Sequence, residues 1–64
     1  MSDHCTTEIQ RAVENAAQTG ELLRVATVAR RIAGMCDAPA KLVADRLTEA
    51  GIRAGLTMQF GKPD

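Results

Sequence analysis

The chain has 64 residues, with eight basic and eight acidic side chains and a formal net charge of zero. This length allows one small domain with a simple core and excludes a second domain. Phe60 is the only aromatic residue, so Leu, Ile, Val, Met and Ala must form the core, and a large ligand pocket is not expected. Such a core leaves little net stability, which a partner chain or a nucleic acid would increase.

The sequence shows no sign of a membrane or export segment. No apolar run is long enough to cross a membrane, and the first ten residues (MSDHCTTEIQ) lack the basic start and apolar stretch of a signal peptide. We therefore expect a soluble, cytoplasmic protein with one domain over residues 1–64, of which 1–6 and 61–64 are flexible. In that compartment Cys5 and Cys36 are expected as free thiols, and a disulfide is the alternative.

A first helix is predicted from the region of Thr7. Thr7 and Gln10 match a capping box, in which each side chain accepts a hydrogen bond from the other residue's backbone N–H. Gly20 is suited to end this helix in the left-handed conformation. The apolar residues recur at three- and four-residue spacing, and they are Ile9, Ala12, Val13, Ala16 and Ala17. The next segment, ELLRV at 21–25, is rich in branched residues and predicts a short strand.

A second helix is expected to start at Thr27, whose hydroxyl can cap the first free amides. Gly34 interrupts the helical pattern, Met35 follows as an apolar plug for a turn between helices, and Asp37 is placed to N-cap the next helix. The buried face of the second helix would be Val28, Ala29 and Ile32, with Ala33 at its edge and with Arg30 and Arg31 pointing away.

The third helix is predicted from Ala38 to about Ala50, closed by Gly51, with Ile52 packed back over its last turn. Its inner face would be Leu42, Val43, Leu47 and Ala50, and its outer face Ala40, Lys41, Ala44, Asp45 and Thr48. Short side chains near the helix start would let the backbone approach a DNA groove, where Lys41 could reach a phosphate or a guanine edge. Arg46 at the flank could contact phosphate. A solvated amphipathic helix has the same pattern.

Residues 52–60 alternate apolar and polar side chains, which predicts a strand with one apolar face. This strand can pair with ELLRV, and Ala54-Gly55 would be either a hairpin tip or a bulge, so one strand and a hairpin both remain possible. Arg53, Thr57 and Gln59 would face solvent. There they could contact a sugar-phosphate backbone or simply line an edge strand.

The charges divide unevenly between the two parts of the chain. Residues 1–23 carry four carboxylates against one arginine, a net charge of −3, whereas residues 24–53 carry six basic side chains against three carboxylates, a net charge of +3. The segment with the two later helices is therefore the basic one, as a DNA-binding module requires.

No residue pattern indicates catalysis, a metal or a cofactor. His4, Cys5 and Cys36 lack the paired spacing that places two metal ligands on one rigid element. A glycine-rich phosphate loop, a nucleophile elbow and paired carboxylates in a cleft are also missing from the sequence. We expect no enzyme activity, no metal and no cofactor.

The predicted element order resembles the small winged helix-turn-helix regulators of bacteria, especially the compact kind found in the ferrous-iron-transport regulator FeoC and in fimbrial switch regulators. The similarity spans residues 8–60 and is carried by VARRIAGM, by PAKLVADRLTEAGI and by RAGLTMQF. It implies a mainly α, three-helix fold with a small β element, in the order α-β-α-α-β(β). The turn at 34–37 is longer than the compact spacing, and 53–60 lacks the cysteine cluster of the FeoC type, so no iron–sulfur role is implied.

Two functions remain as hypotheses. The first is a DNA-binding transcriptional regulator, acting on duplex DNA as a homodimer with its third helix in the major groove. Its predicted contact residues are Arg30, Arg31, Ala40, Lys41, Ala44, Asp45, Arg46, Thr48 and Arg53. The alternative is a small protein–protein interaction module that uses the same fold to bind a protein partner, which the zero net charge, the alanine-rich helix faces and the open strand edge favour.

Overall fold

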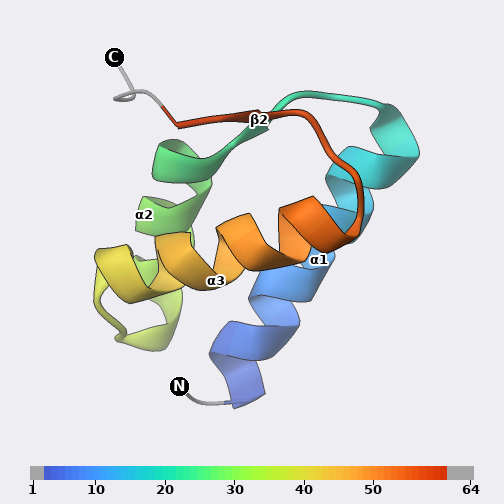
Figure 1. Cartoon of the computed structure of the whole chain (residues 1–64). Helices are drawn as coiled ribbons and strands as arrows, with labels where there is room; N and C mark the ends of the chain where they lie inside the picture. The colour runs from blue at the N-terminus through green and yellow to red at the C-terminus, as the bar shows by residue number, and fades with distance from the viewer. Residues whose placement is uncertain (1–2, 61–64) are drawn as a thin grey trace.

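A computed structural model describes residues 3–60 of the chain. Three helices and two short strands follow one another as α1 (Asp3–Thr19), β1 (Leu23–Arg24), α2 (Val25–Cys36), α3 (Ala40–Arg53) and β2 (Met58–Gln59) (Figure 1). The fold is mainly α with a small β element, and its elements have the predicted order α-β-α-α-β. Among residues 3–60 no helix combines the length and apolarity needed to cross a membrane.

Helix α1 begins earlier than the capping-box pattern predicted. It starts at Asp3, and the Thr7 hydroxyl donates to the Asp3 carbonyl oxygen over 2.9 Å inside the helix, so Thr7 is not an N-cap. Residues 3–6 are therefore helical rather than flexible, while 1–2 and 61–64 lie outside the described residues. The extra turn forms because Cys5 continues the buried stripe of the helix. Gly20 ends α1 as predicted, with φ 72 and its N–H donating to the Ala16 carbonyl.

Helix α2 begins at Val25, directly after β1, so that Arg24 and not Thr27 holds the N-cap position. It continues through Gly34 to Cys36, and Met35, predicted as a buried plug, is 48% exposed. The predicted break at Gly34 is wrong because one glycine costs a helix only about 1 kcal/mol. The additional turn carries Cys36 onto the same side of the helix as Ile32, where it packs against the core.

Asp37 ends α2 instead of N-capping α3. It adopts the left-handed conformation (φ 53, ψ 49), and its N–H donates to the Ala33 carbonyl oxygen. Pro39, with extended backbone, occupies the N-cap position of α3 without a side-chain cap. Only residues 37–39 separate the helices, so the connection is shorter than the sequence indicated and matches a helix-turn-helix turn.

The left-handed conformation of Asp37 gives a testable ranking of stability. Glycine adopts this conformation without steric cost, aspartate tolerates it, and alanine does not. We expect Asp37→Gly to be the most stable, the wild type intermediate and Asp37→Ala the least stable, over a span of about 1 kcal/mol. Urea unfolding of the three proteins measures this order, and an alanine variant more stable than the glycine variant would contradict it.

Helix α3 ends at Arg53, three residues beyond the predicted end. Its end is marked by Gly55 (φ 71), whose N–H donates to Ile52, while the Leu56 N–H donates to Gly51 over 3.0 Å. These two hydrogen bonds form a Schellman motif. Ile52 is 64% exposed, so the prediction that it packs over the last turn is also wrong.

Gly51 lies inside α3 and is buried because β1 and β2 approach the helix at this point. A Cβ added there would lie 2.5 Å from the Met58 Sδ and 3.3 Å from the Leu23 Cδ2. At Gly34 an added Cβ would meet nothing within 4 Å. Glycine at position 51 is therefore required by close packing.

This contrast predicts opposite effects of one substitution at two glycines. Gly51→Leu is expected to lower the free energy of unfolding by about 1–3 kcal/mol, because the side chain must displace Met58 and Leu23. The matched control Gly34→Leu is expected to raise it by about 0.5–1 kcal/mol through helix propensity. Thermal or urea unfolding of both variants tests the packing, and equal effects would contradict it.

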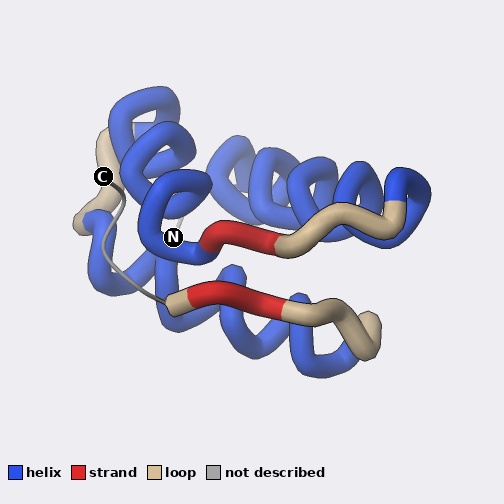
Figure 2. The backbone as a smooth tube through the Cα atoms, turned by 90° about the horizontal axis from the view of Figure 1, so that it is seen from above, coloured by secondary structure: helices blue, strands red, loops and turns tan. Residues whose placement is uncertain are grey.

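The two strands pair in parallel, with Leu23 opposite Met58 and Arg24 opposite Gln59. The predicted pairing of the two segments is thus correct, but the strand is much shorter than 52–60, because residues 52–53 belong to α3 and the turn follows. Among the described residues this region forms one short strand and no hairpin. Figure 2 shows β1 leading directly into α2 and β2 lying alongside it.

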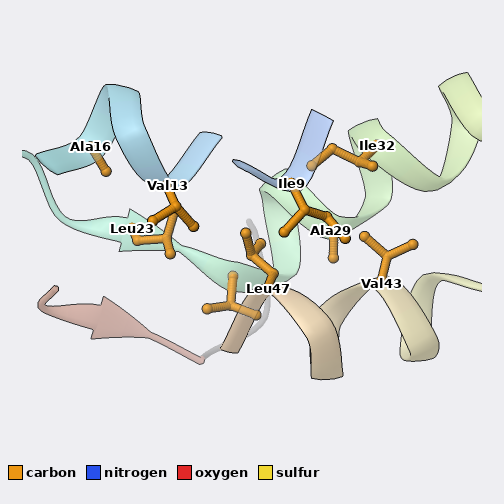
Figure 3. Close-up of a cluster of buried hydrophobic side chains, with 9 residues drawn as sticks. Ile9, Val13, Ala16, Leu23, Ala29, Ile32, Val43 and Leu47 are labelled. Carbon is orange, nitrogen blue, oxygen red and sulfur yellow. The ribbon is translucent and has the colours of Figure 1, made fainter. Parts of the chain in front are cut away.

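The core lies where the three helices and β1 meet (Figure 3). Its fully buried large side chains include Ile32 and Leu47, and no polar side chain is buried among residues 3–60. The predicted apolar stripes are confirmed for most positions, although Ala17 is exposed and Leu42 only half-buried. The buried set is Ile9, Val13, Ala16, Leu23, Val25, Ala29, Ile32, Val43 and Leu47.

Cys5 and Cys36 form a disulfide, with a Cα–Cα distance of 5.4 Å. The prediction of free thiols is therefore wrong. Cys5 lies four residues before Ile9 and Cys36 four residues after Ile32, so the buried stripes of α1 and α2 bring the two thiols together.

Candidate nucleic-acid interface

The outer face of α3 carries part of the predicted contact set. Close approach of a helix to a DNA groove requires exposed short side chains. Ala40 provides one at the start of α3, beside the exposed Lys41. Asp45 is exposed one turn further on. Ile52 follows on the same side of the helix and is 64% exposed. The exposed outer face of α3 is thus a stripe with one cation, one anion and one large apolar side chain.

Two of the predicted contact residues are less available than expected. Ala44 is half-buried and packs against the core. Thr48 is also half-buried, and its hydroxyl donates to the Ala44 carbonyl oxygen over 2.8 Å. Such a bond to the preceding turn holds the hydroxyl close to the helix backbone. The surface that could meet a groove is therefore narrower than the sequence pattern indicated.

Arg46 and Arg53 lie away from Lys41, on the side of α3 that faces α1. Together with Glu49 they line a groove of about 370 Å³ between the two helices. Both arginines are exposed. The structure thus separates the predicted α3 contacts into an outer face with Lys41 and a flank with Arg46 and Arg53.

One of the two basic residues of α2 lies beside a second groove. Arg30 and Arg31 are exposed, and Arg31 lines a groove of about 570 Å³ together with Thr27 and Arg24. Arg24 is absent from the predicted contact set, although it belongs to the net-basic segment 24–53, and this charge is the signal in the sequence that points to it. In the structure Arg24 holds the N-cap position of α2.

The basic side chains of residues 24–53 have no carboxylate partner among the described residues. The only ion pair among residues 3–60 joins Arg11 to Glu8 within α1, at 3.6 Å. The six basic side chains of residues 24–53 therefore make no ion pair with a described carboxylate. The first turn of α3 also carries no acidic residue and no side-chain cap. Lys41 consequently lies beside free amides at the positive end of a helix, an arrangement that suits a phosphate.

The described residues form no cluster of metal-ligating side chains. Residues 3–60 contain no group of three His, Cys, Asp or Glu side chains that could hold a metal ion. Both cysteines of the possible His4–Cys5–Cys36 set are joined in the disulfide, and a thiolate is needed to ligate a metal.

No family model matches the chain, and comparison with the curated proteins and with the solved structures likewise returns no match.

Proposed function

We propose that the protein is a DNA-binding transcriptional regulator of the helix-turn-helix type, with α3 in the major groove and α2 supporting it; in place of the predicted wing, the described residues have the single short strand β2. One observation carries the proposal: the segment 24–53, which contains the helix-turn-helix unit, has six basic side chains that form no ion pair with a carboxylate among residues 3–60. Phosphate neutralisation by such cations supplies most non-specific DNA affinity.

The helix pair supports this function through its geometry. The turn at 37–39 is short, and α3 starts with small and basic side chains that allow its backbone to approach a groove. Lys41 would reach a base edge or phosphate, while Arg30, Arg31, Arg46 and Arg53 would contact phosphates on the two flanks. Because the net charge of residues 24–53 is only +3, one copy of the chain would bind DNA weakly. The proposal therefore includes a homodimer that binds two half-sites. Such a regulator acts inside the cell, in the cytoplasm.

A titration of a fluorescent generic duplex with oxidised protein at low salt tests the proposal. We expect saturable binding in the micromolar range, typical of non-specific affinity. No change in anisotropy at any protein concentration would contradict DNA binding.

Ile52 favours a second function, a protein–protein interaction module. Its side chain is 64% exposed on the side of α3 that carries Lys41 and Asp45, where a DNA groove would offer it little apolar contact and would repel the carboxylate. A protein partner would bury the isoleucine and could pair with both charges.

The two functions respond differently to Ile52→Ser. For a protein partner recovered by co-purification, the substitution is expected to remove the partner. For DNA, it is expected to change affinity by less than about twofold, because the serine neither adds nor removes charge. A stoichiometric protein partner that is lost from the Ile52→Ser variant, together with no DNA binding by the wild type, would favour the second function.

A further inference from the structure

The Cys5–Cys36 disulfide lies immediately beside the helix-turn-helix turn. It joins the first turn of α1 to the last residue of α2, across a sequence separation of 31. The next residue, Asp37, has the left-handed conformation that ends α2, and α3 begins three residues later. The bond therefore fixes the end of α2 from which the DNA-contacting helix starts.

Backbone carbonyl oxygens lie close to both sulfur atoms of the disulfide. The Cys36 Sγ lies 3.1 Å from the Ile32 carbonyl oxygen, and the Cys5 Sγ lies 3.7 Å from the Cys36 carbonyl oxygen. After reduction the two sulfur atoms must move apart from bonding distance, and these oxygens are available as acceptors for the new S–H groups. Reduction therefore requires a local shift of the two side chains.

The two cysteine residues differ in exposure. Cys5 is fully buried, whereas Cys36 is half-buried at the end of its helix. A thiolate from solvent would therefore attack the Cys36 Sγ and displace Cys5. Intracellular disulfides of this kind are usually transient and redox-sensing.

We infer that the Cys5–Cys36 pair is a reversible redox switch that controls the order of the turn at 37–39 and thereby the DNA affinity of α3; this inference rests on the proposed function. The reductant is a dithiol. Its first thiolate attacks the Cys36 Sγ, forming a mixed disulfide, and Cys5 leaves as a thiolate that takes up a proton. Its second thiolate then closes the reductant's own disulfide and releases Cys36, which is also protonated.

Few hydrogen bonds hold the turn when the disulfide is open. The Asp37 N–H donates to Ala33, and the Ala38 N–H donates to the same carbonyl oxygen over a long 3.4 Å. The N-terminus of α3 has no side-chain cap. In the reduced protein the turn therefore opens more often, and Lys41 is no longer held in one position relative to α2.

The test compares oxidised protein, protein reduced with dithiothreitol, and reduced protein that has been reoxidised. We expect reduction to weaken binding to a generic duplex at least tenfold, reoxidation to restore it, and hydrogen exchange of residues 37–41 to accelerate on reduction more than that of 43–50. Titrated thiols confirm the redox state. The Cys5→Ser plus Cys36→Ser variant should behave like the reduced wild type, and the reductant should change neither its affinity nor its hydrogen exchange. If this variant does not fold, the reduced wild type provides the same comparison.

The outcomes separate the switch from the proposed function. Equal DNA affinity and equal exchange in both states would overturn the switch and leave DNA binding intact. Faster exchange on reduction without DNA binding in either state would support the structural switch and contradict the DNA-binding function. Affinity that is not recovered on reoxidation would overturn reversibility and therefore the inference.

Discussion

Opening the Cys5–Cys36 disulfide is expected to lower the free energy of unfolding by about 3–4 kcal/mol. The bond closes a loop over a sequence separation of 31 residues, and in the chain-entropy model a cross-link of this span removes conformations mainly from the unfolded chain. Urea unfolding of oxidised and reduced protein under otherwise equal conditions measures the difference.

This effect is large for a chain of 64 residues. A domain of this size has a total stability of roughly 3–10 kcal/mol, so the reduced protein retains only part of it. The expected fall in Tm is about 12–30 °C. The Cys5→Ser plus Cys36→Ser variant serves as the control, and the reductant should not change its Tm. A reduced wild type whose Tm lies within about 3 °C of the oxidised protein would contradict the prediction.

Reversal of charge at Lys41 and Arg46 is expected to weaken DNA binding by at least about 100-fold at low salt, because two phosphate contacts become repulsive. Both side chains are exposed, so the fold should be retained. Fluorescence anisotropy with one duplex, supported by circular dichroism of each variant, measures the effect.

Arg11→Glu provides a control matched in charge. Arg11 is exposed on α1 and belongs to the acidic part of the chain, where its partner is Glu8. The control variant should lose less than about threefold in affinity relative to the wild type, since Arg11 lies outside the proposed interface. The single variant Lys41→Glu should lose more. Equal losses for the two single variants would show that DNA affinity depends on the net charge of the protein alone. This result would contradict a role for the outer face of α3.

The apolar spacing of the sequence predicts much of this fold. The stripes around Ile9, Ile32 and Leu47 identify the buried side of each helix because side chains three and four residues apart share one face. The predicted element order is also correct. Such patterns are informative because burial of a whole stripe outweighs the preference of any single residue.

The sequence predicts the helix ends less well, because short polar residues and glycine suit several positions at or near a helix end. Thr7 and Thr27 match N-caps, yet each lies within a helix that starts earlier. Asp37 matches the start of α3 but ends α2 in the left-handed conformation. Gly51 resembles a helix stop, but its small size allows close contact with the strands, and Gly55 is the left-handed residue.

The candidate site was predictable only in outline. The exposed basic residues follow from charge and helical period, whereas their division into an outer face and two grooves depends on how α1 packs against α2 and α3. The disulfide has a signal in the sequence: Cys5 lies four residues before the core residue Ile9, and Cys36 lies four residues after the core residue Ile32. A cytoplasmic location nevertheless predicts free thiols, because disulfides are rare in that compartment.

The salt dependence of binding to a generic duplex tests DNA recognition by this helix-turn-helix unit most directly. Because each neutralised phosphate contributes about −0.9 to the slope of log affinity against log salt concentration, contacts from four to six basic side chains predict a slope of about −4 to −5. The measurement uses oxidised protein between low and moderate salt. A slope in this range supports phosphate contacts by the basic side chains of α2 and α3, whereas absent binding at low salt, or a slope near zero, would contradict them.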